Sequence, residues 1–285
     1  INLANLPIDP INKPPYYYTF VAGGSYAVYA QLEDPKNQAS KNDQDNYPHL
    51  YSVGTNKRLI DQAQGLVLYL PFDEGSGTFV KDIILNASGT ISNPYGDEWV
   101  NGVKGSAYRQ NNVATNTSLA ISGNEGEWAS LFTKKEFSVA YFFKVDTYYT
   151  WNRIAPVALP KHGWAGDFIG DSQTLFIQHT TRVNGTWTEI NCGSKYVNLD
   201  QWYFFVYTFS KKDAKCYLNA VLYNISSFSQ EVDTVLPYVT NDRIGTWRTC
   251  CGTPPYYWRG SIDEVRVYNR ALSDSEIKAL YDSIK

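Results

Sequence analysis

The strongest constraint on the fold of this chain is a series of short apolar runs that recur from residue 65 onward between Gly, Asn and Asp. In the run Phe137–Val145 the apolar side chains keep a period of two, which is the pattern of a strand with one buried face. The run Trp202–Phe209 is apolar on both faces, as a central strand should be. Many short strands separated by turn signals predict an all-β sandwich.

The sequence predicts one short helix, at the C-terminus. No segment before residue 273 has a helical period. Ser273 can cap the helix while the Glu276 side chain reaches back to the cap. Ile277, Leu280 and Tyr281 then form the apolar stripe that docks the helix on the sandwich.

The strand before this helix contains an irregularity. Val265 and Val267 keep a period of two, but Ile262 falls out of phase with them. The break at Asp263 and Glu264 predicts a β-bulge, which can re-aim a side chain. Asp263 is therefore a candidate metal ligand, and the alternative is an edge carboxylate in water.

Seven segments, in sequence order, resemble the laminin-G-like, concanavalin A-like jelly-roll domains of bacterial surface proteins. The resemblance implies a two-sheet jelly-roll sandwich with a short C-terminal helix over residues 65–285. Residues 100–108 match the short second strand of that family. The segments are residues 66–77, 100–108, 137–145, 202–209, 215–222, 243–247 and 260–281.

The first sixty residues have a different character. Two expected strands, Tyr16–Val21 and Ser25–Leu32, flank Gly23-Gly24, which is a strong hairpin signal. A polar loop follows, and Tyr51–Gly54 can return as a third strand. We therefore expect a small antiparallel β unit over residues 1–62, separate from the jelly roll but in contact with it.

This N-terminal segment resembles the C-terminal part of type IV pilins and type II secretion pseudopilins. The matching residues are Leu6–Pro10, Ala30–Glu33 and Tyr51–Thr55. The hydrophobic N-terminal helix of that family is absent, and the chain starts at Ile1 without any Met, so we expect that an N-terminal piece was removed. The alternative is an unrelated three-stranded cap on the jelly roll.

The jelly-roll resemblance also implies a structural calcium ion. In related domains such an ion ties the first strands to the last through backbone oxygens and one carboxylate. Carried over, the site would use the side chain of Asp263 and the backbone near Phe72, Asp73 and Gly105. Asp73 is also a candidate direct ligand, although Asp73-Glu74-Gly75 can equally be a simple turn.

Aromatic residues in predicted loops are candidates for sugar binding, because pyranose rings stack on Trp and Tyr. The loop 246–259 is the densest, and its prolines and adjacent cysteines would make it rigid. Packing within the sandwich is the alternative role for each aromatic residue. The candidates are Trp247, Tyr256, Tyr257 and Trp258, with Trp151, Trp164 and Trp187 as neighbours.

Four cysteines are compatible with an oxidising compartment. Cys192 and Cys216 fall on or near predicted strands and could form a bridge, whereas a bond between the adjacent Cys250 and Cys251 would need a strained turn. The sequence leaves all three pairings of these candidates open.

Several functions are disfavoured. The carboxylate motif Glu-x-Asp-x-x-Glu of the glucanases that share the fold is absent, so we expect no enzyme activity. The net charge is −3 with no Lys/Arg cluster, which argues against a nucleic-acid partner, and the apolar runs are too short to span a membrane.

We therefore expect an extracellular adhesion module that binds a glycan or a cell-surface protein. The alternative is a filament subunit that packs with other pilin subunits and binds no glycan.

Overall fold

A computed structural model of the 285-residue chain places most of the sandwich. The residues that it describes are 19–22, 26–31, 50–54, 65–84, 88–92, 98–111, 118–122, 136–147, 152–154, 157–159, 164–171, 174–183, 186–227, 243–244, 246–247, 256–257 and 259–284. Within this part of the chain, no helix has the length and apolar character needed to cross a membrane.

The N-terminal strands form a sheet of their own. Strand β1 (Thr19–Ala22) pairs antiparallel with β2 (Tyr26–Gln31), and β2 pairs antiparallel with β3 (Leu50–Gly54). Among the described strands, none of these three pairs with a strand of the sandwich. The two strands on either side of Gly23-Gly24 therefore pair with each other, and the third strand pairs with β2, as the sequence predicts.

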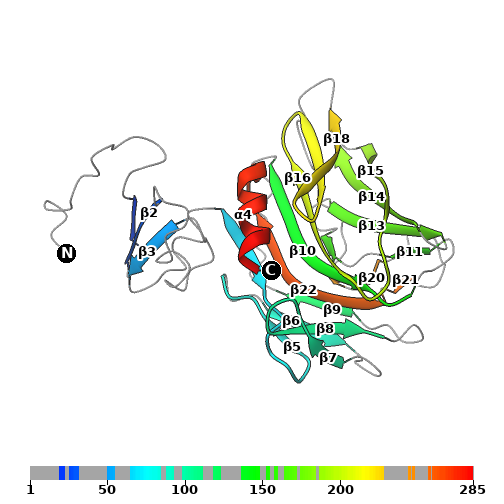
Figure 1. The fold of residues 1–285 in the computed structure, drawn as a ribbon, viewed down its shortest axis with the longest axis horizontal. Coiled ribbons are helices and arrows are strands. Elements are labelled where there is room, and N and C mark those ends of the chain that lie inside the picture. Colours follow the sequence, from blue (N-terminus) through cyan, green and yellow to red (C-terminus); the bar gives the residue numbers. More distant parts are fainter. Residues whose placement is uncertain are drawn as a thin grey trace, which may run out of the picture.

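The first sandwich sheet has the strand order β18-β17-β16-β10-β22-β8-β7, and β4 also pairs with β22. The long central strands β10, β16 and β22 form its middle (Figure 1). Its strands are β4 (Leu66–Leu70), β7 (Glu98–Asn101), β8 (Ser106–Gln110), β10 (Phe137–Val145), β16 (Trp202–Phe209), β17 (Asp213–Leu218), β18 (Val221–Ser227) and β22 (Gly260–Tyr268).

The second sheet has the order β15-β14-β13-β12-β19-β9-β6-β5, with β11 on β13. A separate two-stranded ribbon joins β20 (Thr246–Trp247) to β21 (Tyr256–Tyr257). The strands of the second sheet are β5 (Phe79–Lys81), β6 (Ser88–Ser92), β9 (Ser118–Ser122), β11 (Asn152–Ile154), β12 (Val157–Leu159), β13 (Trp164–Asp171), β14 (Thr174–Val183), β15 (Thr186–Tyr196) and β19 (Arg243–Ile244).

One hydrophobic core fills the space between the sheets. Tyr141, Phe205 and Val267 enter it from the first sheet, and Val80 and Val157 enter it from the second. Residues from both sheets belong to the same buried cluster, which is the arrangement of a two-layer sandwich. The predicted all-β fold is confirmed.

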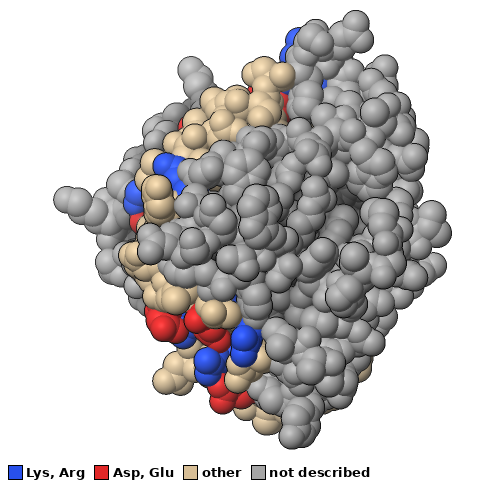
Figure 2. Space-filling view, turned by 90° about the vertical axis from the view of Figure 1, so that its right-hand side faces the viewer, with Lys and Arg blue, Asp and Glu red and all other residues tan. Residues whose placement is uncertain are grey.

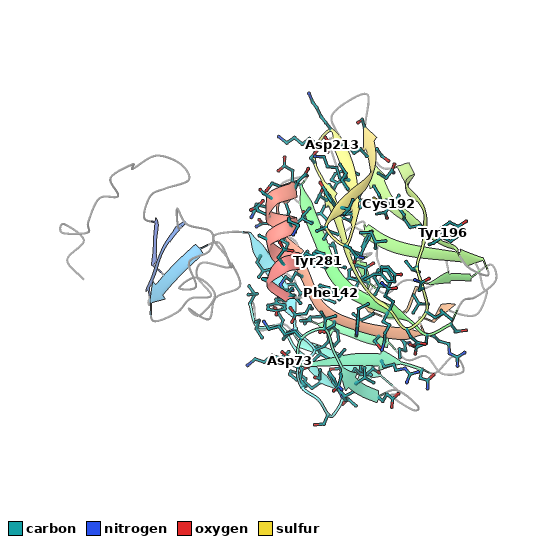
Figure 3. All side chains as sticks on the ribbon, in the orientation of Figure 1. Asp73, Phe142, Cys192, Tyr196, Asp213 and Tyr281 are labelled. Atoms are coloured by element: carbon teal, nitrogen blue, oxygen red, sulfur yellow. A yellow bond between two sulfur atoms is a disulfide. The ribbon has the colours of Figure 1, made fainter. Side chains whose placement is uncertain are left out.

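The helix α4 (Asp274–Ile284) covers the outer face of the first sheet, which is the face turned away from the core (Figure 1). Ser273 Oγ accepts a hydrogen bond from Glu276 N, and Glu276 Oε2 accepts one from Ser273 N, so the predicted capping box is present. Tyr281 stacks on Phe142 at a centroid distance of 6.3 Å (Figure 3). This packing buries a second apolar cluster beneath the helix.

The segment expected as one short strand over residues 100–108 is instead a hairpin, so that expectation was wrong. Strands β7 and β8 are joined by a tight turn in which Gly102 N donates to Gly105 O at 3.0 Å. Gly105 has φ +64°, a conformation that glycine adopts without strain. This turn, residues 102–105, lies at the candidate metal site.

Candidate functional site

The predicted irregularity in β22 is a β-bulge. Ala140 pairs with Arg266 and Phe142 pairs with Asp263, so Tyr141 alone stands opposite Glu264 and Val265. Glu264 has φ +56°, which is unusual for a residue with a side chain.

The bulge resets the two-residue period of the strand. Ile262 and Val265 both enter the core cluster although they are three residues apart. Asp263 and Glu264 do not belong to that cluster, yet both are fully buried. The bulge therefore holds two neighbouring carboxylates inside the protein but outside its apolar core.

Glu264 is held by a buried polar network on the outer face. The Tyr69 hydroxyl donates to Glu264 at 2.9 Å, and Arg266 Nη2 forms a 2.6 Å ion pair with Glu264 Oε2. The Arg266 guanidinium also lies 3.9 Å from the centre of the Tyr69 ring. Burial raises the pKa of the Tyr69 hydroxyl well above its ordinary value, so it stays protonated and can donate.

Asp263 is directed instead at the turn between β7 and β8. Its Oδ2 accepts hydrogen bonds from Val103 N at 2.8 Å and Lys104 N at 3.3 Å. Its Oδ1 is buried without a hydrogen-bond partner among the described residues. Burial first, and then the charge of Glu264, raise the pKa of Asp263 to about 8, although the two backbone hydrogen bonds act in the opposite direction.

The remaining candidate metal ligands meet at the same turn. Ser106 N donates to Asp73 Oδ1 at 3.0 Å, and Ser106 Oγ donates to the Phe72 carbonyl oxygen at 2.6 Å. A Cβ on Gly105 would clash with Asp73 Oδ1, so this position also needs a glycine for space. The structure thus brings Phe72, Asp73, Gly105 and Asp263 around one turn.

These residues fit a calcium ion. A cation would give the buried Asp263 Oδ1 a partner, and it would offset the burial and the charges of Glu264 and Asp73 that raise the pKa of Asp263. Among the described residues, no three His, Cys, Asp or Glu side chains gather as a metal cluster. Calcium takes many of its oxygens from backbone carbonyls, so such a cluster is not required.

One end of the sandwich gathers several of the aromatic candidates. We define the rim as residues 145–147, 196–201 and 259–260. Two backbone hydrogen bonds join these segments: Asp146 N donates to Arg259 O at 3.2 Å, and Asp200 N donates to Val145 O at 2.9 Å. The ribbon of Trp247, Tyr256 and Tyr257 lies beside β11.

The backbone ladder places β11 at the level of the rim. Asn152 pairs with Gly170, the adjacent Asp171 pairs with Thr174, and Thr174 pairs with Tyr196. Trp151 and Trp258 lie outside the described residues, next in sequence to β11 and β21.

The same ladder places Trp164 and Trp187 elsewhere. Trp164 pairs with Thr181 and Trp187 pairs with Arg182, at the opposite end of the second sheet. Nine residues of β15 separate Trp187 from Tyr196, which corresponds to about 30 Å of strand. The register therefore does not bring these two tryptophans to the rim.

The rim carboxylate Asp146 is paired with Arg109, which also binds Glu98. Arg109 contacts Asp146 Oδ2 through Nε and Glu98 Oε1 through Nη1, each at 2.6 Å. The hydrogen bond to Asp146 is the main reason why the pKa of Arg109 is raised. In the space-filling view, described basic and acidic side chains are interspersed rather than gathered by sign (Figure 2).

Cys192 and Cys216 form a disulfide, as the sequence allowed, with 5.8 Å between their Cα atoms. Cys192 is on β15 and Cys216 is on β17, so the bond joins the two sheets across the core (Figure 3). Cys250 and Cys251 lie outside the described residues.

The sequence reasoning missed the partners of Glu264. Tyr69 and Arg266 were not singled out, although an arginine among the valines of a buried strand is itself a signal that a paired charge is present. Both partners bind the carboxylate of Glu264 inside the protein.

Comparison with known proteins agrees with this architecture. Residues 108–278 match the Laminin_G_3 family model, which is described as the concanavalin A-like lectin/glucanases superfamily. No curated protein sequence matches the chain.

Solved structures with the same fold include domain 4 of AbnA, a GH43 extracellular arabinanase from Geobacillus stearothermophilus, in complex with arabinotriose. It has a TM-score of 0.55 and 18% identity, and the match covers 76% of this chain and 98% of that one. At this identity the likeness shows the fold alone.

Two clostridial toxin structures are also similar. The first, of botulinum neurotoxin type C, whose cell entry depends on interaction with two ganglioside molecules, has a TM-score of 0.55 and 13% identity over 78% of this chain and 51% of that one. The second is the binding domain of botulinum neurotoxin DC in complex with rat synaptotagmin II. It has a TM-score of 0.53 and 12% identity, and the match covers 78% of this chain and 52% of that one. The chain spans about half the length of these toxin structures.

Proposed function

Because the chain belongs to the concanavalin A-like lectin/glucanases superfamily, we propose that it is a surface-exposed recognition module that binds carbohydrate. The observation that carries this proposal is the position of the β20–β21 ribbon beside β11, level with the rim. Trp247, Tyr256 and Tyr257 come together there in the backbone, and Trp151 and Trp258 are adjacent in sequence. Aromatic rings stack on the C–H faces of sugars and provide a large rigid contact area.

Two of the structural neighbours support this class of ligand. One neighbour is a domain in complex with arabinotriose, and another is a toxin that interacts with gangliosides. Synaptotagmin in a third complex favours a protein receptor as the second class of ligand. We place carbohydrate first because of the number of aromatic residues in the β20–β21 ribbon and adjacent to it in sequence.

We propose a binding role without catalysis. Retaining glycoside hydrolysis needs two carboxyl groups about 5 Å apart across the scissile bond, with access to the sugar. Asp263 and Glu264 are adjacent but fully buried, and Glu264 is paired with Arg266. Neither carboxylate can reach a polymer without unfolding of the strand.

We further propose that calcium stabilises the module. Asp263 would hold the ion through its side chain, with Asp73 and the backbone near Phe72 and Gly105 supplying further oxygens. The ion would balance the buried carboxylate and tie β4 and the β7–β8 turn to β22.

Presentation at a cell surface is the last part of the proposal. The three-stranded unit over residues 1–62 resembles the end of a pilin, which suggests a filament subunit that carries the jelly roll. The disulfide between Cys192 and Cys216 is typical of an oxidising, extracellular environment. A purely structural filament role, with packing against other pilin subunits and no glycan binding, is the alternative.

The deciding experiment measures retention of the protein on immobilised arabinan, xylan, β-glucan and ganglioside. We expect binding to at least one of them, and loss of that binding when Tyr257 and Trp258 are changed to Ala. Absence of binding to every surface would favour the structural filament role. Release of reducing sugar from any polymer would contradict the proposal that the module is not an enzyme.

A further inference from the structure

Tyr196 is the most exposed of the large apolar side chains that the structure describes, at 77%. It ends β15 and lies on the side of the sandwich opposite to α4 (Figure 3). A ring held in water contributes little to the stability of the folded domain, because it buries almost no apolar area. The exposed ring is therefore available to a ligand without loss of stability in the fold.

The backbone on both sides of this ring is fixed. Val197, the next residue, is buried in the core between the sheets. Asn198 N donates to the Tyr203 hydroxyl at 2.8 Å, and Asn198 Nδ2 donates to Gln201 Oε1 at 3.0 Å. The ring of Tyr196 is thus presented on a rigid support, which lowers the entropic cost of binding.

Tyr196 also lies at the rim, level with the β20–β21 ribbon of the proposed binding site. It pairs with Thr174, which in turn pairs with Asp171. Asn152 of β11 pairs with Gly170, the residue next to Asp171, so Tyr196 and Asn152 are one residue apart in level along the sheet. On its other side, the turn residue Asp200 is bonded to Val145 of β10. Tyr196 is therefore at the same end of the sandwich as the β20–β21 ribbon.

The turn that follows Tyr196 in sequence is polar, apart from one apolar residue. Asn198, Asp200 and Gln201 are exposed in the same turn, and Leu199 is 37% exposed. The ammonium of Lys195 is engaged elsewhere, 5.3 Å from the centre of the Tyr223 ring. An exposed aromatic ring, followed in the chain by exposed amide and carboxylate groups, matches a sugar ring, which has an apolar C–H face and an edge of hydroxyl groups.

We propose that Tyr196 is a stacking platform for one sugar ring of the bound glycan, with the turn 198–201 supplying hydrogen bonds to its hydroxyl groups. The inference rests on the proposed carbohydrate binding and extends that site from the β20–β21 ribbon to the end of β15.

The test compares three variants of the full chain on whichever of the arabinan, xylan, β-glucan and ganglioside surfaces retains the unmodified protein. Tyr196→Ala removes the ring, and Tyr196→Phe keeps the ring but removes the hydroxyl. Phe79→Ala is the matched control, because Phe79 is 52% exposed on β5, at the opposite edge of the second sheet. Both positions are on the surface, so the melting temperatures of all three variants should stay close to that of the unmodified protein.

We expect Tyr196→Ala to weaken binding at least about tenfold, as the loss of one aromatic contact does. Tyr196→Phe should stay within about threefold, and Phe79→Ala should bind normally. Normal binding by Tyr196→Ala, with a loss only in the Tyr257 and Trp258 variant, would overturn the role of Tyr196 and leave the proposed function intact. Absence of binding by the unmodified protein would overturn both.

Discussion

The hydroxyl of Tyr69 lies 2.9 Å from each carboxylate oxygen of Glu264, a residue 195 positions further along the chain. This contact joins the first strand of the sandwich to the last at the bulge. The bulge residue has a left-handed backbone, and its side chain is bound from two sides by Tyr69 and Arg266. The irregular backbone is therefore supported by side-chain contacts that a regular strand would not make.

Removal of the charge on Glu264 should destabilise the domain. In Glu264→Gln the buried Arg266 guanidinium loses its counter-ion, which costs about 3–5 kcal/mol when one partner of a buried pair is removed. Tyr69→Phe removes only a hydroxyl and should cost about 1–2 kcal/mol. Urea denaturation of the two variants would measure both costs. Equal stability of Glu264→Gln and the unmodified protein would show that the pair is not ionised in the folded state.

Calcium should raise the melting temperature through Asp263. At a concentration about 100 times its dissociation constant, an ion that binds only the folded state stabilises it by about 2.7 kcal/mol. Asp263→Asn should fold, because Val103 N and Lys104 N can still donate to its side-chain oxygen, but should not respond to calcium. The control is Asp282→Asn, which changes an exposed carboxylate on α4. A normal calcium response in Asp263→Asn would place the ion elsewhere.

The disulfide should make the sandwich sensitive to reductant. Cys192 and Cys216 are 24 positions apart, and closure of a loop of that length stabilises a domain by about 3 kcal/mol. Reductant should lower the melting temperature of the unmodified protein and leave that of the Cys192→Ser, Cys216→Ser variant unchanged. A variant with serine at positions 250 and 251 is the control and should keep the sensitivity. If this control no longer responds to reductant, the sensitivity of the unmodified protein comes from Cys250 and Cys251 and not from the bond between Cys192 and Cys216.

Glu276 should contribute to stability only above acidic pH. Burial opposes its ionisation, but the bonds from Arg270 and Ser273 outweigh burial and lower the pKa of Glu276 to about 2. Since the folded pKa is below the unfolded value, the contribution is complete above about pH 4.5 and is lost as the pH falls toward 2. Glu276→Gln should be less stable by about 1–2 kcal/mol at pH 6 and equal to the unmodified protein near pH 2. If the difference in stability between Glu276→Gln and the unmodified protein does not change with pH, the shape of the Glu276 side chain and not its charge is responsible for that difference.

The sequence predicted the parts of this fold that depend on local pattern. The phase break between Ile262 and Val265 located the bulge, and Ser273 with Glu276 located the start of the helix. Strands β10 and β16 were identifiable because their apolar residues are continuous.

Other features could not be read from the local pattern, because that pattern fits more than one structure or because the contacts join distant residues. Residues 100–108 appeared to be one strand because the turn at Gly102 and Gly105 is flanked by residues that suit a strand equally well. Tyr69, one of the two partners of Glu264, is 195 positions away in sequence. An exposed Tyr196 at the end of a strand has the same local pattern as a buried one.

The chain enters the sandwich at the end opposite to the rim, because Leu66 pairs with Tyr268 while Gly260 begins β22 at the rim. If a ligand holds the rim and residues 1–64 anchor the module, tension pulls β4 along its own axis past β22. The hydrogen bonds between antiparallel strands lie across that direction, so they would share the load instead of opening one after another. The path of the chain through β4 therefore suits a module that has to hold its ligand under mechanical force.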